Sequence, residues 1–277
     1  MTLLGAAEIR ELAEKLELRP SKGLGQNFVH DGNTCRKIVR TVDVTPKDIA
    51  LEIGPGLGSL TLELLESARQ VIAVEIDSRL ATQLPLTAAA HSTRSQNLTV
   101  IHGDALRVQE LPAPPTVLVA NLPYNVSVPV LLHVLETFPS IERGVVMVQA
   151  EVADRLAAQP GGKDYGAPSA KAAWWAELRL AGSVSRSIFW PVPNVDSKLV
   201  AFVRHVPMGS ESERLRTFAL IDAAFAQRRK MLRTALASVV GTPTQVEALM
   251  MRAGIDPTLR GESLSISDFY AIACAQL

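Results

Sequence analysis

The segment Asn121-Leu122-Pro123-Tyr124 carries residue types that suit chemistry on the amino group of adenine, and it follows an apolar run, residues 117–120, that predicts a buried strand. The amino nitrogen of adenine is a poor nucleophile, because its lone pair is delocalised into the ring. Its alkylation needs acceptors for the amino hydrogens and a fixed distance to the donor. The side-chain oxygen of Asn121 and the carbonyl of Leu122 are candidate acceptors, and Tyr124 offers a face for a purine. The segment also fits a plain strand-to-helix turn, with an Asn cap and a core tyrosine.

A glycine-rich segment, residues 54–58, lies between a predicted strand at Ile49–Ile53 and a helix that extends to about Ser67. Glycines such as Gly54 and Gly56 let a ligand approach closely, and the helix N-terminus offers free amides. Dinucleotide-binding folds place a glycine loop at the same point. The tight Glu-x-Gly-x-Gly-x-Gly spacing favours S-adenosylmethionine as the ligand. A Walker phosphate loop is excluded, because no Gly-Lys-Ser/Thr follows.

Two carboxylates end the next two predicted strands, at residues 71–75 and 98–102. Glu75 is placed to accept hydrogen bonds from both hydroxyls of a ribose, and Asp104 from the amino group of the donor's adenine. Each also fits an ordinary role, a solvated strand-end acid for Glu75 and a cap or turn residue for Asp104. Open α/β sheets bind ligands at the carboxyl ends of their strands. The two acids, the glycine segment and Asn121 therefore predict one site on one rim of a sheet.

The elements that hold these residues alternate between short apolar runs and helical patterns, which predicts a parallel sheet wound with helices. The expected strands are Ile49–Ile53, 71–75, Leu98–His102, one ending at Ala120, and Arg143–Gln149. Between residues 174 and 206 we expect two more strands, joined by an ordered loop at the proline-rich residues 190–193. From Ser212 the pattern is helical. We therefore expect an α/β domain over residues 1–206 and a small helical domain over residues 207–277.

Composition limits the class of protein. With 277 residues and 47% hydrophobic content, the chain is long enough for one α/β domain and a smaller one. Residues 6–18 carry four glutamates and predict an amphipathic helix instead of a signal peptide, and no apolar run approaches membrane-spanning length. We expect a cytoplasmic protein that contacts no membrane. Cys35 and Cys274 match no metal or redox spacing, so reduced structural thiols are favoured and no metal is expected.

The 28 basic and 28 acidic residues cancel, so any binding of nucleic acid depends on local patches. One patch lies within six residues that contain no acid; its members are Arg228, Arg229, Lys230 and Arg233. The pattern over residues 225–233 predicts one helix, with the apolar side chains inward and the basic ones on other faces. A solvated face is the usual explanation of such a run, and contact with RNA phosphates is the alternative.

In order and spacing, these segments resemble the ribosomal RNA adenine dimethyltransferase family, which includes the bacterial kasugamycin-sensitivity enzyme and the erythromycin-resistance methylases. The resemblance runs from about Leu24 to Leu236. It is carried by Gly25-Gln26-Asn27-Phe28 and by residues 51–58, 74–77, 103–105, 121–127, 163–166, 189–197 and 225–230. The family implies an α/β fold: a Rossmann-like S-adenosylmethionine-dependent methyltransferase sheet, mainly parallel with an antiparallel last strand, and a small C-terminal helical domain.

The resemblance also implies roles for individual residues. Donor contacts come from Asn27, Val29, Gly54, Gly56, Glu75, Asp104 and Asn121. Tyr124 and Phe189 hold the target adenine between them after it leaves its stack. Without the resemblance, Phe189 would be interpreted as a core aromatic. The resemblance implies that the patch Arg228, Arg229, Lys230 and Arg233 contacts the RNA backbone. It thereby makes residues 1–206 the S-adenosylmethionine-binding catalytic domain and residues 207–277 the RNA-recognition domain.

The implied function is dimethylation of N6 on two adjacent adenosines in a hairpin near the 3′ end of small-subunit (16S) rRNA, with S-adenosyl-L-methionine as the donor. The zero net charge departs from a strongly basic RNA-binding protein and favours a target presented by an assembling 30S particle. We expect the enzyme to act as a monomer. Two alternatives stay open: a 23S rRNA methylase that confers macrolide resistance, and a binding or assembly-checkpoint factor. The intact segment at residues 121–124 argues for retained catalysis.

Overall fold

The computed structural model describes residues 3–18 and 27–276, so Gly25 and Gln26 of the resemblance lie outside the described residues. The chain divides into two compact units. The larger comprises Met1–Ala153 and Arg179–Arg204, and the smaller comprises Asp154–Leu178 and His205–Leu277. The predicted division at residue 206 concerns catalysis and RNA recognition, and it stays a prediction.

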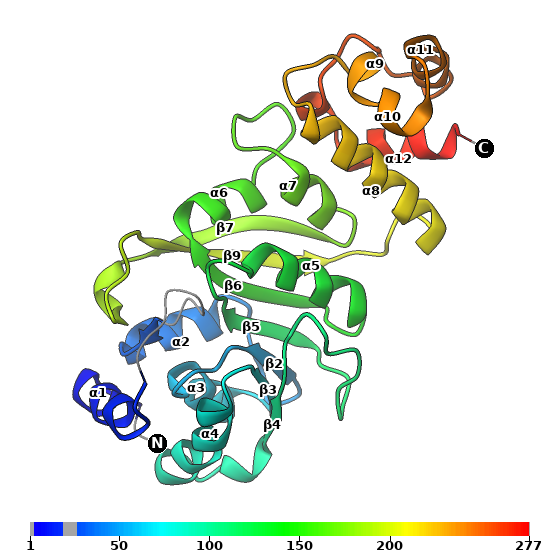
Figure 1. The fold of residues 1–277 in the computed structure, drawn as a ribbon. Coiled ribbons are helices and arrows are strands. Elements are labelled where there is room, and N and C mark those ends of the chain that lie inside the picture. Colours follow the sequence, from blue (N-terminus) through cyan, green and yellow to red (C-terminus); the bar gives the residue numbers. More distant parts are fainter. Residues whose placement is uncertain (1–2, 19–26, 277) are drawn as a thin grey trace. The chain divides into compact units, whose positions relative to one another are not determined.

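A seven-stranded sheet forms the framework, in the order β4-β3-β2-β5-β6-β9-β7 (Figure 1). Its strands are β2 (Ile49–Ile53), β3 (Gln70–Glu75), β4 (Leu98–His102), β5 (Val117–Asn121), β6 (Arg143–Gln149), β7 (Ala176–Val184) and β9 (Ser197–Arg204). Strands β2 to β6 pair in parallel, and β9 pairs antiparallel to β6. The predicted parallel sheet with an antiparallel late strand is confirmed.

The helices of the larger unit follow the strands in alternation. They are α1 (Ala6–Lys15), α2 (Gly32–Arg40), α3 (Ser59–Ser67), α4 (Ser78–His91), the 3-10 turns η1 (Ser95–Asn97) and η2 (Arg186–Ile188), and α5 (Ser127–Thr137); α6 (Ala150–Leu156) spans the boundary between the units. One core cluster joins α2 and α3 to alternate residues of the strands, among them Val117, Val119, Val145 and Met147. Alternate strand residues share one face of a sheet, so α2 and α3 cover that face.

A second, two-stranded sheet was not predicted. Strand β1 (Phe28–Val29) pairs antiparallel with β8 (Phe189–Trp190), with Phe28 opposite Trp190 and Val29 opposite Phe189. The segment at residues 190–193, predicted as loop, therefore begins in a short strand. This strand ends before Pro191, which has no N–H to donate to a further ladder. The β1–β8 sheet brings the N-terminal segment against the late proline-rich one.

The smaller unit is helical. Its helices are α7 (Ala167–Ala172), α8 (Glu211–Ala226), α9 (Leu232–Ala235), α10 (Ala237–Val240), α11 (Pro243–Arg252), η3 (Gly261–Ser263) and α12 (Ile266–Cys274). Capping boxes at Ser210, Thr242 and Ser265 begin α8, α11 and α12. Within the described ranges, no helix is both long and apolar enough to cross a membrane.

The predicted single helix over residues 225–233 is wrong. Helix α8 ends at Ala226, and α9 begins at Leu232. The backbone N–H groups of Leu232 and Arg233 donate to the carbonyls of Leu259 and Pro257, at 2.8 and 3.2 Å. These tertiary hydrogen bonds replace the helical ones, so the local pattern alone could not reveal the break.

Candidate active site

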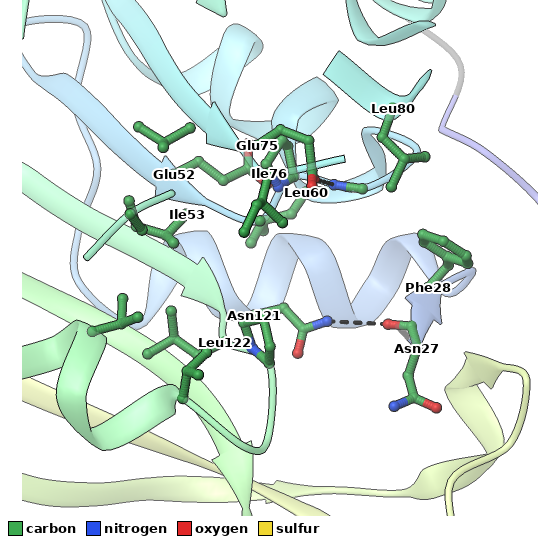
Figure 2. Close-up of a pocket in the computed structure, with 18 of the residues that line it drawn as sticks. Asn27, Phe28, Glu52, Ile53, Leu60, Glu75, Ile76, Leu80, Asn121 and Leu122 are labelled. Atoms are coloured by element: carbon green, nitrogen blue, oxygen red, sulfur yellow. Dashed lines mark hydrogen bonds between the residues drawn. The ribbon is translucent and has the colours of Figure 1, made fainter. Parts of the chain in front are cut away.

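A pocket at the carboxyl ends of the parallel strands collects most of the predicted site residues (Figure 2). Its lining includes Asn27, Val29, Gly54, Gly56, Glu75, Asp104, Asn121, Leu122 and Tyr124. These residues come from β1 and from the ends of β2, β3, β4 and β5. The pocket lies at the rim of the sheet, where the strand ends predicted a site. That its lining residues bind the methyl donor stays a prediction.

The glycine segment forms a tight loop between β2 and α3. Gly54, Gly56 and Gly58 have φ angles of 68°, 58° and 103°, in the left-handed region that side chains disfavour. A Cβ on Gly56 would also lie 2.9 Å from Cδ1 of Phe28, closer than real Cβ contacts allow. Gly56 is therefore required both by its backbone conformation and by the close approach of β1.

Glu75 ends β3 and is only 4% exposed. Its Oε2 accepts a hydrogen bond from the Gly56 N–H at 3.1 Å, and its Oε1 accepts from the Asp77 N–H at 3.0 Å. Burial raises the pKa of this carboxyl, and backbone hydrogen bonds from Asp77, Gly56 and Ile76 oppose that effect. Each carboxylate oxygen can still accept a second hydrogen bond. The side chain is thus held between the glycine loop and the start of α4, with capacity left for two ligand hydroxyls.

Glu52, which the sequence singled out only through its spacing to the glycines, also lines the pocket. It is 1% exposed on β2, and the Thr61 hydroxyl donates to its Oε2 at 2.6 Å. Burial raises the pKa of Glu52 to about 8. The signal was present in the sequence, because an acid in the middle of an apolar strand needs either a partner or a ligand.

Asp104 follows β4 and lines the pocket while it also builds a turn. Its Oδ1 accepts from the Leu106 N–H at 2.9 Å, and Arg107 Nε lies 3.7 Å from Oδ2. The Asp104 side chain is 38% exposed, far more open than Glu75. The turn role is present, and it leaves oxygen lone pairs free for a ligand.

Asn121 ends β5, and its side chain reaches across the pocket. Its Nδ2 donates to the carbonyl oxygen of Asn27 at 3.2 Å, which fixes the amide so that Oδ1 is left as an acceptor (Figure 2). The alternative of a helix cap does not hold, since α5 begins six residues later and its N-cap is Val126. A single hydrogen bond to Asn27, the residue before β1, thus orients the amide at the rim.

The rest of the loop is anchored on both sides. Leu122 is 1% exposed, and its N–H donates to the carbonyl of Met147 at 3.1 Å. The Tyr124 hydroxyl lies 3.1 Å from Ser197 Oγ, and burial raises the pKa of Tyr124. Tyr124 is therefore held at its hydroxyl end, while its side chain lines the pocket.

Phe189 does not line this pocket. It is 1% exposed and belongs to the core cluster that contains Val29 and Leu199. Its neighbour Trp190 stacks on Phe28, with ring centroids 6.4 Å apart and planes 19° apart. An adenine held between Tyr124 and Phe189 would need a face of Phe189 that is covered in this structure, so the sandwich stays a prediction.

The basic patch lies in the smaller unit and has two kinds of member. Arg228 Nε lies 2.9 Å from Glu262 Oε2, and Arg228 Nη2 donates to the carbonyl of Lys163 at 2.7 Å. Arg233 pairs with Glu247 at 3.3 Å. The other two members, Arg229 and Lys230, are exposed and form no ion pair with any described residue. The latter two are therefore the members best placed for phosphate contact.

Comparison with known proteins agrees with this geometry. The family model for ribosomal RNA adenine dimethylase matches residues 18–275. Curated proteins named ribosomal RNA small subunit methyltransferase A are similar along almost their whole length. That of Streptomyces avermitilis is 59% identical over 274 residues, with 98% of this chain and 93% of the relative covered. That of Thermobifida fusca is 58% identical over 273 residues, covering 98% and 95%.

Solved structures give the same result. A dimethyladenosine transferase from Plasmodium falciparum superposes with a TM-score of 0.74 at 25% identity, covering 88% of this chain and 95% of that one. The 23S rRNA methyltransferase ErmE superposes with a TM-score of 0.67 at 27% identity, covering 90% and 99%. The family model and the curated relatives each span nearly the whole chain. This protein therefore belongs to the ribosomal RNA adenine dimethylase family.

Proposed function

We propose that this protein transfers methyl groups from S-adenosyl-L-methionine to N6 of two adjacent adenosines near the 3′ end of small-subunit rRNA, within an assembling 30S particle. One observation carries the chemistry: Asn121 is fixed by Asn27 at the rim of the pocket with its Oδ1 left as an acceptor. The family and the names of its relatives support an rRNA methyltransferase. The dimethyl product, the particle and a monomeric enzyme are parts of the proposal.

The pocket fits a nucleoside donor by the chemistry of its lining. Glu75 presents a held carboxylate for paired hydroxyls, and the more open Asp104 presents one for an amino group. Gly56 lets the ligand approach the backbone, because no Cβ fits there. The exposed apolar side chain of Ile76 also lines the pocket and offers a surface for a flat ring. When bound, the donor would supply a methyl group already activated on a sulfonium sulfur.

The acceptor side needs no strong base. Asn121 Oδ1 accepts one amino hydrogen, which favours a pyramidal nitrogen as the bond to the methyl carbon forms. The sulfur of a bound donor would take the electron pair of the carbon–sulfur bond, and the lost N6 proton would go to solvent. A second round needs a fresh donor and the remaining N–H turned toward Asn121. Tyr124 holds the base at a fixed distance.

The small-subunit target is favoured over the large-subunit one. Relatives 58–59% identical to this chain carry the small-subunit name, whereas the 23S enzyme compared above is 27% identical. The zero net charge suits a target whose other contacts come from an assembled particle.

Transfer of labelled methyl groups to three substrates tests the proposal. The substrates are unmethylated small-subunit particles, naked small-subunit rRNA and naked large-subunit rRNA. We expect dimethyladenosine chiefly in the particles. Label chiefly in large-subunit rRNA would instead identify a 23S rRNA methylase of the kind that confers macrolide resistance. Donor binding without transfer to any substrate would overturn the catalytic proposal and leave a binding role.

A further inference from the structure

One face of α2 carries a row of cations outside the donor pocket. A shallow groove there is lined by Asn33, Arg36, Lys37, Arg40 and Thr41. These positions follow the spacing of a single helical face, and the opposite face, with Ile38 and Val39, is buried in the core. The groove therefore faces outward from the larger unit with three positive side chains.

These charges are poorly neutralised. Arg36 donates to Asn33 Oδ1 at 2.7 Å, and none of the three cations forms an ion pair with any residue in the described ranges. Arg36 and Arg40 interact with the partly buried Glu63 of α3, whose pKa is raised by burial and lowered by these two arginines. The lining of the groove itself contains three cations and no acid, so the groove carries net positive charge.

The groove begins close to the donor pocket. Helix α2 starts at Gly32, three residues after Val29, which lines that pocket. The other end of α2 lies near the start of β6, where Arg143 Nε donates to the carbonyl of Val42 at 2.8 Å. Strand β6 runs from that end to the rim. Helix α2 therefore runs from the rim toward the amino ends of the parallel strands. One end of the basic face therefore lies close to the part of the pocket that β1 lines.

We propose that the α2 groove binds the phosphate backbone of the substrate RNA beside the target adenosines. The inference rests on the proposed function for the identity of the RNA. Arg36 and Arg40 are one turn apart, with Cβ atoms about 5–6 Å from each other, and Lys37 lies beside them. A row of cations suits a polyanion with repeated charges better than one small anion. The Lys37 ammonium lies close to Gly182 of β7, since a Cβ added to that glycine would be 3.2 Å from it.

A triple variant, Arg36→Gln/Lys37→Gln/Arg40→Gln, tests the groove, because glutamine keeps the length and helix propensity and removes the charge. Its matched control is Arg10→Gln/Lys47→Gln/Arg69→Gln, which removes three exposed cations elsewhere on the larger unit. Binding to naked small-subunit rRNA and to unmethylated particles is measured as a function of salt, together with donor affinity and thermal unfolding.

We expect the triple variant to reduce the slope of log affinity against log salt by about 2, because each lost phosphate contact removes about 0.7. Its affinity for naked rRNA should fall about 10- to 100-fold at low salt, and its donor affinity should not change. The control variant should bind rRNA and donor as the wild type does. Equal slopes for triple variant and control would overturn the inference. So would loss of binding to particles with naked rRNA unaffected, because that result points to an acidic ribosomal protein.

Two further measurements keep the outcomes separate. If the triple variant unfolds, the three single Gln variants replace it, and each should carry about a third of the slope change. Methyl transfer by the wild type is scored independently of binding. If the wild type binds rRNA with the expected slope but transfers no methyl group, the proposed function is wrong and the RNA-binding groove stands. If the wild type transfers methyl groups but the variants keep the wild-type slope, the proposed function stands and the groove is wrong.

Discussion

The proposed function assigns one side of the pocket to the donor and the other to the target adenine, and these two sides are built differently. On the donor side, Glu75 is almost fully buried and accepts two backbone hydrogen bonds, one of them from Gly56. On the acceptor side, one hydrogen bond orients Asn121, Tyr124 is only half-buried, and Phe189 lies in the core. The donor side is thus preorganised by the chain itself. On the adenine side, Asn121 Oδ1 is already oriented to accept a hydrogen bond, whereas the ring face of Phe189 is covered.

The sharpest test of this contrast is Asn121→Ala. Loss of an oriented polar group that acts mainly in the transition state lowers rates by about 10²- to 10³-fold in other enzymes. We expect a decrease of that order in single-turnover methyl transfer, with donor affinity changed by only a few-fold. The matched control is Asn125→Ala, which is exposed and outside the pocket lining. Equal losses of transfer in both variants would mean that loop structure, and not the Oδ1 acceptor, carries the effect.

On the donor side, Glu75→Gln should weaken donor binding by about 10- to 100-fold, because a hydrogen bond to a buried charge contributes about 1.5–3 kcal/mol. The amide nitrogen also cannot accept from either Gly56 or Asp77. Asp104→Asn is the matched comparison, and its more exposed side chain should give a smaller loss. Calorimetric titration with the donor measures both. A larger effect at Asp104 would contradict the view that burial makes Glu75 the stronger contact.

Glu52, buried beside the glycine loop, makes the free energy of unfolding depend on pH. Its folded pKa of about 8 lies above its ordinary value of 4.5. Between these values the folded chain keeps a proton that the unfolded chain has lost, so stability is lost as pH rises through that window, by about 1.4 kcal/mol per pH unit. Relative to Glu52→Gln, the wild type should lose about 2 kcal/mol between about pH 6 and about pH 7.5. Urea unfolding of both proteins measures the difference, and parallel pH curves would show that Glu52 ionises normally.

The two sides also differ in what the sequence could reveal. Gly56, Glu75 and Asn121 sit at strand ends, and the rim of a parallel sheet brings strand ends together whatever the side chains do elsewhere. That these strands are parallel followed from the same alternation of elements, whereas their order in the sheet was not predicted. The position of Phe189 depends on the pairing of β1 with β8, a contact between segments about 160 residues apart that no local pattern encodes. The break before Leu232 has the same cause, since its N–H donates to Leu259.

The β1–β8 sheet is where the two sides meet, so Trp190→Ala is the finest test of the contrast. Phe28 lines the donor pocket, and Trp190 stacks on it beside Phe189. An aromatic pair contributes about 0.5–1.5 kcal/mol, so loss of the stack should weaken donor binding by about 2- to 10-fold. The Trp190→Phe variant keeps a stacking ring and should bind the donor nearly as the wild type does.

Trp190 also reports on the sheet directly. In a Trp174→Phe/Trp175→Phe background it is the remaining tryptophan, so its fluorescence follows β8 alone. If the donor side is preorganised, the donor should change this emission little, whereas substrate RNA should change it more as the Phe189 face opens. A large change with donor alone would mean that β8 responds to the donor before any RNA arrives. The two sides would then be filled in a fixed order, because the covered aromatic face would be released only after the donor pocket is occupied.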